Sequence, residues 1–545
     1  MQYLTDADQK FSALRADRQS WWLHWRELAD YILPRRYQWL VSPNQQNRGS
    51  QINQQIIDST GTIAARTCAS GMMAGITSPS RPWFKLRLAG FNPGDTSNPI
   101  SIWLDDVETL MMKVFSESNF YNSIATVYYD LVVFGTAAQI IYEDFENIIH
   151  CYNPCLGEFF LQNSPKMEVN TFYREFVRTA PQLVAEFGAD NCPEDVVTTA
   201  KQPSGAAREF TVRHCVEPNT GTSPVSKKFQ FRELYWVVGM TEKPLRAKGF
   251  NEFPVNAVRW DLTGNDAYGR SPGMDALPDI KQLQQEQKRK AQALDKMVNP
   301  PLQADIQLKN QPASLLPGAI TYVAGSNNIG IKPIFQINPP FAELMADIQE
   351  VQNRIRTVFF NDLFMMISQL QTVRSATEID ARREEKLVML GPVLERLENE
   401  LLGPAITRVF AIMSRAGILP EPPEEIAGMP LDIEYVSMLA EAQRISATSA
   451  IERVLATAGN LSAVAPEVLD NIDFDQAIDE YASLLRVKPR IIRDREQVAE
   501  IRAGRAQKQQ AQEQMAMAGE AIKGAELLSK TEVGGGQNAL GMMMQ

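Results

Sequence analysis

Two Asn-Pro-Pro triplets, at residues 299–301 and 338–340, constrain this fold more than any other feature of the sequence. Proline cannot continue a helix and pushes the residue before it into extended geometry, so the first triplet ends the helical pattern that precedes it. The last proline of the second triplet can occupy a first helical position and begin the next helix. The sequence therefore predicts an outgoing helix from about Asp279 to Val298 and a returning helix from Phe341 to about Met366. At about 1.5 Å per residue, these helices span ~30 and ~39 Å.

The two helices offer little apolar surface to each other. The outgoing helix is interrupted by an almost wholly polar stretch, Gln284–Gln292. The returning helix carries a single apolar stripe at steps of three and four: Phe341, Leu344, Ile348, Val351, Ile355 and Val358. Such a pair buries little by itself, so we expect it to pack side by side with copies of itself. The alternative is an ordinary helical hairpin docked on a globular body.

The length and composition indicate a soluble protein of two to four domains. The chain has 545 residues, of which 44% are hydrophobic and 22% charged. Its longest apolar run, Leu131–Ile141, is far shorter than the ~20 residues that span a bilayer. Acidic and basic residues stand where a signal peptide would be apolar: Asp6, Asp8 and Lys10. We therefore expect synthesis in a cytoplasm and no contact with a membrane.

The net charge of −11 argues against a protein that grips nucleic acid over a broad surface, because lysine and arginine supply most of the non-specific affinity for phosphates. An acidic protein can still lie beside DNA, but it then repels the DNA rather than holding it.

The periodicity predicts a mainly α protein with an α+β body. In the body we expect helices at 5–33, 51–73, 102–115, 121–134 and 181–187, with strands at 83–88, 138–143, 158–161, 171–177, 210–216 and 229–238. A helical tract over 377–415 should kink or divide at Gly391-Pro392 and at Gly403-Pro404. Another helical region covers 437–505, and the composition of the Gln- and Met-rich segment after it does not require it to pack.

No catalytic site emerges from the motifs. Gly264–Ser271 is one residue from a phosphate-binding P-loop, which would need lysine at Arg270, and Pro272 and Gly273 follow where a P-loop continues into its helix. The three histidines are scattered along the chain: His24, His150 and His214. We therefore expect no enzyme, no catalytic residue and no cofactor.

A zinc site is also disfavoured. The cysteines are few and odd in number, and in a cytoplasm they are expected to be reduced: Cys68, Cys151, Cys155, Cys192 and Cys215. Three residues separate Cys151 from Cys155, where zinc sites more often have two, and neighbouring His and Cys residues point to opposite faces of a strand.

The order of the segments resembles the portal, or head-to-tail connector, proteins of short-tailed bacteriophages (podovirus type). No single motif is decisive, but their order over nearly the whole chain is. The matching segments are Gly71–Gly75, Ser80–Leu86, Ser118–Tyr121, Asp130–Thr136, Tyr268–Gly273, Glu434–Ser437 with Gln443-Arg444, and Asp470–Asp475.

The resemblance implies a ring, usually of twelve subunits, at one capsid vertex of the virion, assembled in the host cytoplasm around a channel for double-stranded DNA. Its partners would be copies of itself, capsid and scaffold proteins, the packaging motor (terminase) and tail adaptor proteins. The implied parts are a wing (1–275 and 377–430), a two-helix stem (276–298 and 341–366), a small β-containing clip (299–340), a tunnel loop (367–376), a helical crown (431–506) and a flexible tail (507–545).

Three groups of residues become candidate sites in that frame. One side of the returning helix carries three acidic residues, Glu343, Asp347 and Glu350, which we call the acidic band. The acidic band would face the channel, or else it forms a solvated outer face. The tunnel loop would offer polar groups to DNA: Ser368, Gln369, Gln371, Thr372, Arg374 and Ser375. Around a ring, Arg374 would form a collar of positive charge that contacts phosphates, or else it is a structural residue that caps the preceding helix. The clip turns would dock the motor and tail, or are turns and nothing more: Asn310, Gln311, Pro312, Gly325, Ser326, Asn327 and Asn328.

Two alternatives from other classes remain open. One is a P-loop-like packaging NTPase, which Arg270 disfavours, and the other is a self-associating scaffold without a channel.

Overall fold

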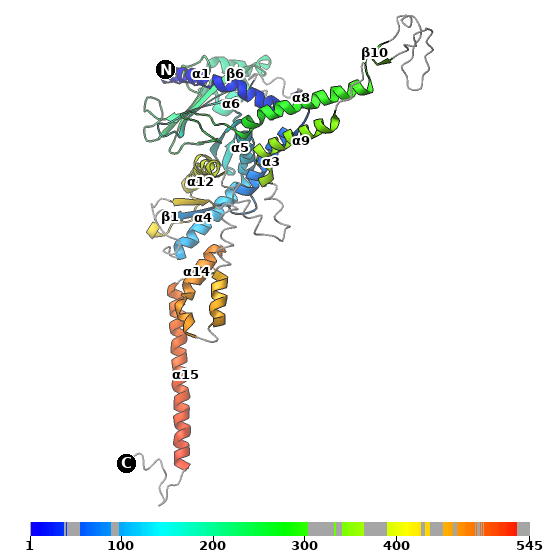
Figure 1. The fold of residues 1–545 in the computed structure, drawn as a ribbon. Coiled ribbons are helices and arrows are strands. Elements are labelled where there is room, and N and C mark those ends of the chain that lie inside the picture. Colours follow the sequence, from blue (N-terminus) through cyan, green and yellow to red (C-terminus); the bar gives the residue numbers. More distant parts are fainter. Residues whose placement is uncertain are drawn as a thin grey trace, which may run out of the picture. The chain divides into compact units, whose positions relative to one another are not determined.

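The computed structural model describes residues 2–36, 40, 55–88, 98–303, 332–333, 340–364, 390–426, 431–435, 451–461, 466–485, 487, 491, 493 and 495–530 (Figure 1). The chain divides into two compact units. The first unit comprises residues 1–84, 110–419 and 435–439, and the second comprises 85–109, 420–434 and 440–545. Helices and antiparallel sheets together confirm a mainly α protein with an α+β body.

The described residues of the first unit contain two larger antiparallel sheets. Five strands follow one another in chain order: β4 (Phe159–Asn163), β5 (Val169–Thr179), β6 (Glu209–Pro218), β7 (Phe231–Val237) and β8 (Arg246–Phe250). The smaller sheet has the order β3-β2-β9, with β2 (Thr136–Asp144) between β3 (Ile148–Tyr152) and β9 (Val255–Arg259).

Helices cover both faces of the five-stranded sheet, because alternate side chains of each strand point to opposite faces. On one face, α1 (Gln2–Tyr31) packs Leu4, Phe11 and its neighbours against Tyr173, Cys215 and Trp236. On the other face, α6 (Ala180–Phe187) and α7 (Glu194–Lys201) pack against inward-facing side chains such as Phe176, Val212 and Tyr235.

Five more helices of this unit contact the smaller sheet or pack against one another. They are α3 (Thr60–Ile76), α5 (Phe120–Phe134), α8 (Pro272–Val298), α9 (Phe341–Val358) and α12 (Gly403–Arg415), with short 3-10 turns at Pro34–Arg36, Ala189–Asn191, Pro203–Gly205 and Glu424–Ile426. α4 (Asn98–Glu117) runs across the boundary between the units, and the short strands β10 (Leu302–Gln303) and β11 (Lys332–Pro333) pair with each other.

The second unit holds a two-stranded sheet and a set of helices. β1 (Phe84–Leu88) pairs with β12 (Leu431–Tyr435), and Arg87 forms an ion pair with Glu434. The helices are residues 451–461, the 3-10 segment Pro466–Asn471, α14 (Phe474–Leu484) and α15 (Arg495–Lys530).

The predicted break at Gly403-Pro404 is confirmed. The helix widens to a π turn at Glu398–Leu402 immediately before it, and α12 starts at Gly403. Pro404 has no N–H to give to the carbonyl of Glu400, so the regular ladder cannot continue through this point. The carboxylate of Glu400 binds Arg259 of β9, with its Oε1 2.6 Å from Arg259 Nη2.

Several boundaries predicted from the sequence are wrong. The second helix begins at Thr60 rather than near residue 51, since residues 55–59 are not helical. The returning helix ends at Val358 rather than near Met366, because Phe360 adopts a φ of 55°. Residues 507–530, expected as a flexible tail, continue α15, whose alanine, glutamine, glutamate and lysine are strong helix formers. β3, β8, β9, β12 and α7 were not predicted.

Candidate functional site

α8 and α9 lie side by side (Figure 1), and α8 starts from a tightly packed turn. Gly135 ends α5 with a φ of 78°, and a Cβ placed on it would lie 2.4 Å from the carbonyl oxygen of Gly269. The reverse holds for Gly269, whose Cβ would lie 2.4 Å from the carbonyl oxygen of Gly135. The Gly269 N–H donates to Thr136 Oγ1 at 2.8 Å. Only glycine permits this approach, so Gly269 of the near-P-loop sequence serves packing.

Ser271 then begins α8. Its Oγ donates to the carbonyl oxygen of Val133 at 2.7 Å and accepts from the backbone N–H of Met274 at 3.1 Å. Pro272 occupies the first helical position, where a missing N–H costs nothing. The helix therefore begins seven residues before the predicted Asp279, and the serine hydroxyl that a P-loop would offer to a magnesium ion is already used as a cap.

α9 packs on α8 and α3 through half of its predicted stripe. Ile348, Val351 and Ile355 are buried, whereas Phe341, Leu344 and Val358 are half-buried. Two glycines of α3 let the neighbouring segments approach. A Cβ at Gly61 would lie 2.8 Å from Ile280 of α8, and one at Gly71 would lie 2.2 Å from the ring of Phe364.

The polar residues that interrupt the outgoing stripe bind the segment before α3. Gln284 is 5% exposed. Its Oε1 accepts from the backbone N–H groups of Ile57 at 2.7 Å and Asp58 at 2.8 Å, and its Nε2 donates to the carbonyl oxygen of Asp58 at 2.9 Å. Sequence reasoning missed this contact, since the partners are more than 220 positions apart.

The carboxylate of Asp58 joins both helices of the pair. Its Oδ2 accepts from Gln287 of α8 at 2.8 Å and from Gln352 of α9 at 2.9 Å, and its Oδ1 accepts from the backbone N–H of Thr60 at 2.8 Å. Burial raises the pKa of Asp58, but these hydrogen bonds outweigh it and leave the pKa below its usual value. We call Asp58, Gln284, Gln287 and Gln352 the glutamine clasp.

All three residues of the acidic band are exposed. Glu350 Oε1 lies 3.4 Å from Arg354 Nη1, and Arg354 Nη2 lies 3.2 Å from Asp279 Oδ1 of α8. The band is therefore extended by a carboxylate from the second helix, and Arg354 offsets only part of the charge. The spacing in the sequence predicted the acidic band of α9 but not the contribution of Asp279. Asp279 belongs to α8 and lies near the band only because α8 and α9 pack antiparallel.

The end of the pair far from the glutamine clasp exposes apolar side chains. Their exposed fractions are 46% for Leu294, 41% for Met297, 83% for Val298 and 46% for Met345. Neighbouring apolar groups exposed in this way mark contact sites more often than free surface.

The remaining candidates are the tunnel loop, the clip turns and the cysteines. The predicted residues of the tunnel loop and of the clip lie outside the described residues. In the tunnel loop they are Ser368, Gln369, Gln371, Thr372, Arg374 and Ser375, and in the clip they are Asn310, Gln311, Pro312, Gly325, Ser326, Asn327 and Asn328. All five cysteines are buried, and burial raises the pKa of their thiols, to about 12 for Cys151 and Cys155.

Within the ranges that the structure describes, no three His, Cys, Asp or Glu side chains gather as a metal site would require, and no helix there is long and apolar enough to cross a membrane.

Comparison with known proteins decides the family. The model of the family "Bacteriophage head to tail connecting protein" matches residues 4–492. The chain belongs to this family. Two curated relatives of this connector chain are portal proteins. The "Probable portal protein" of Bordetella phage BPP-1 is 41% identical over 97% of this chain and 96% of its own length. The "Portal protein" of Salmonella phage epsilon15 is 43% identical over 96% of this chain and 95% of its own length. The family suggested by the sequence motifs is thus confirmed, and it is a structural rather than a catalytic one.

Proposed function

We propose that copies of this chain form a closed ring, the twelve-membered ring of the family, at one vertex of a phage capsid. The ring would be the channel through which double-stranded DNA is packaged and later ejected. The observation that carries this proposal is the match with portal proteins over almost the full length of this chain and of its relatives. Connector proteins need no catalytic site, which fits the absence of any catalytic family among the matches.

The helix pair supports ring formation. Its inner half is held by the glutamine clasp and the buried face of α9, whereas its outer half exposes Leu294, Met297, Val298 and Met345. A neighbouring pair in a closed ring would cover these side chains, and each subunit would offer the same surface to the next. The helix pair is thus the stem in our proposal.

The acidic band would line the channel. Repeated around a ring, its carboxylates and Asp279 form a belt of negative charge that repels the phosphates of DNA, so that DNA slides instead of adhering. The rival position, a solvated outer face, would leave the belt without contact with DNA. The work of packaging would come from a separate motor protein.

The clip and the tunnel loop complete the proposal. The clip turns, including Gly325–Asn328, would bind the motor during packaging and the tail adaptor afterwards, because turns at the end of two long helices are well placed for docking. Arg374 of the tunnel loop would touch DNA phosphates weakly. Capsid and scaffold proteins would bind the ring from outside.

The two rivals make different predictions. A packaging NTPase is disfavoured because the Arg270 guanidinium lies 5.7 Å from the ring centroid of Trp21 and the Ser271 hydroxyl caps α8. Mass photometry of the purified full chain, combined with an ATP hydrolysis assay, separates the classes. The proposal predicts a ring of twelve chains of 61.1 kDa, with a mass of about 730 kDa, that hydrolyses no ATP. Hydrolysis that depends on Ser271, or a species of open-ended size, would refute the proposal.

A further inference from the structure

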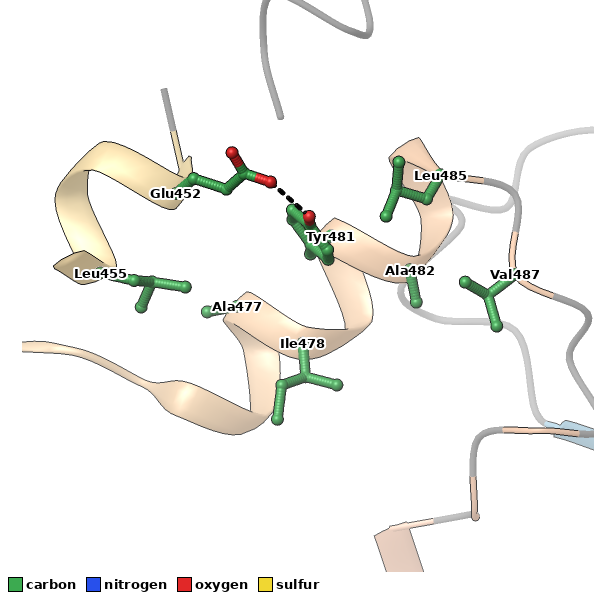
Figure 2. Close-up of a pocket in the computed structure, with 8 residues that line it drawn as sticks. All are labelled: Glu452, Leu455, Ala477, Ile478, Tyr481, Ala482, Leu485 and Val487. Carbon is green, nitrogen blue, oxygen red and sulfur yellow. Dashed lines mark hydrogen bonds between the residues drawn. The ribbon is translucent and has the colours of Figure 1, made fainter. Parts of the chain in front are cut away.

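Two helices of the second unit enclose an apolar groove between them. Residues 451–461 and α14 line it, together with the segment that follows α14 (Figure 2). Its volume is about 460 Å³, large enough for several side chains. Glu452 accepts a hydrogen bond from the hydroxyl of Tyr481 at one edge. The rest of the lining is apolar: Leu455, Ala477, Ile478, Ala482, Leu485 and Val487.

The groove is not covered by the described part of the chain. Ile478 is 58% exposed and Leu485 is 50% exposed, although both side chains are apolar and lie in its wall. Val454, on the first of the two helices, is 59% exposed. Apolar walls of this kind are the usual receptor for the apolar side of an amphipathic helix.

The chain carries a helix side that matches such a groove. α15 places Ala511, Met515, Ala518 and Ile522 at steps of four, three and four, so these residues form one stripe. The side chains of this stripe are exposed, with 78% for Met515 and 68% for Ile522. At about 100° per residue, Glu513 and Glu520 fall on the side of α15 opposite this stripe.

The stripe of a chain cannot reach the groove of the same chain. α15 starts soon after the end of α14, and Arg502 forms two 2.6 Å contacts with Asp475 at the start of α14, so the two helices run antiparallel. Beyond Arg502, α15 passes the start of α14 and continues away from the groove as one helix to Lys530. Met515 and Ile522 lie about 20 and 30 Å further along that axis.

We propose that the stripe Ala511, Met515, Ala518 and Ile522 of one copy docks in the groove between residues 451–461 and α14 of a second copy. Every chain supplies one stripe and one groove. In a closed ring with head-to-tail contacts, each groove therefore receives the stripe of a neighbouring chain. The inference rests on the proposed ring and adds a contact that joins neighbouring subunits.

Disulfide scanning of the full-length protein tests this contact. One cysteine replaces a groove residue (Ile478→Cys or Leu485→Cys) and another replaces a stripe residue (Met515→Cys, Ala518→Cys or Ile522→Cys), which gives six double variants. The five native cysteines are buried, so they are poor competitors. Matched controls combine the same groove variants with Glu513→Cys or Glu520→Cys, on the opposite side of α15. After oxidation with copper phenanthroline and dioxygen, products are separated on a non-reducing denaturing gel.

We expect at least one stripe pair to give a ladder of covalently joined chains, and the single and control variants to give none. Rings without a ladder from any of the six pairs would overturn the docking and leave the ring standing. Ladders of equal yield from the control pairs, or a disulfide confined to one chain, would also overturn it. An unsubstituted protein that forms no rings in the electron microscope would instead refute the proposed function.

Discussion

Replacing Gln284 by alanine should release the segment before α3 without unfolding the helix pair. The substitution removes three hydrogen bonds, two from the backbone N–H groups of Ile57 and Asp58 and one to the carbonyl oxygen of Asp58. Each is worth ~0.5–1.5 kcal/mol net, and water can replace part of this at a half-exposed segment. We expect a loss of about 2 kcal/mol in the local opening free energy, which is about a 30-fold change in an equilibrium constant.

Hydrogen exchange read by mass spectrometry measures this loss directly. Peptides that cover residues 56–62 should exchange about 30-fold faster in Gln284→Ala, while peptides from β5 and β6 should be unchanged. Gln285→Ala is the matched control, since it makes the same change at the exposed neighbouring position of α8. Equal exchange at residues 56–62 in the two variants would refute the reasoning. So would faster exchange spread along all of α8, because that would show helix fraying instead of a lost clasp.

Four further outcomes follow from the same description. Reversing the acidic band to lysine should slow packaging in low salt and let it recover as salt rises, because the new attraction to DNA is screened; equal packaging at every ionic strength would place the band away from the channel. Arg374→Ala should assemble rings and begin packaging but retain less genome, and full heads that hold their DNA at normal yield would contradict its role. Deleting Ser326–Ile329 should leave rings intact but abolish tail attachment. Tailed, infectious particles from this deletion variant would disprove the docking role of the clip. The lowered pKa of Asp58 means that its carboxylate stabilises the fold above its ordinary pKa of about 3.9, and that this stability is lost as the pH falls through the lower folded value. Asp58→Asn should therefore flatten that acid-side change in the urea midpoint, and an unchanged pH dependence would show that Asp58 does not cause it.

The sequence predicted the elements whose pattern is local. Proline triplets set the facing ends of α8 and α9, and the spacing of Ile348, Val351 and Ile355 identified the buried side of α9. The break at Gly403-Pro404 was equally visible, because a proline inside a helical tract removes a hydrogen bond of the helix.

Tertiary contacts decided what the sequence could not show. All five residues of β9 are buried, so the strand lacks the alternation that marks a half-buried strand. The end of α9 depends on Phe360 at positive φ, in a segment where Phe364 fits against Gly71 of α3. The role of Asp58 depends on partners from two distant helices, and the role of Asp279 depends on Arg354.

Electron microscopy of the purified full chain tests the central claim most directly, with top views of single particles classified by symmetry. The proposal predicts closed rings of one rotational symmetry with a central hole. Monomers, open filaments, or closed particles without a hole would contradict it.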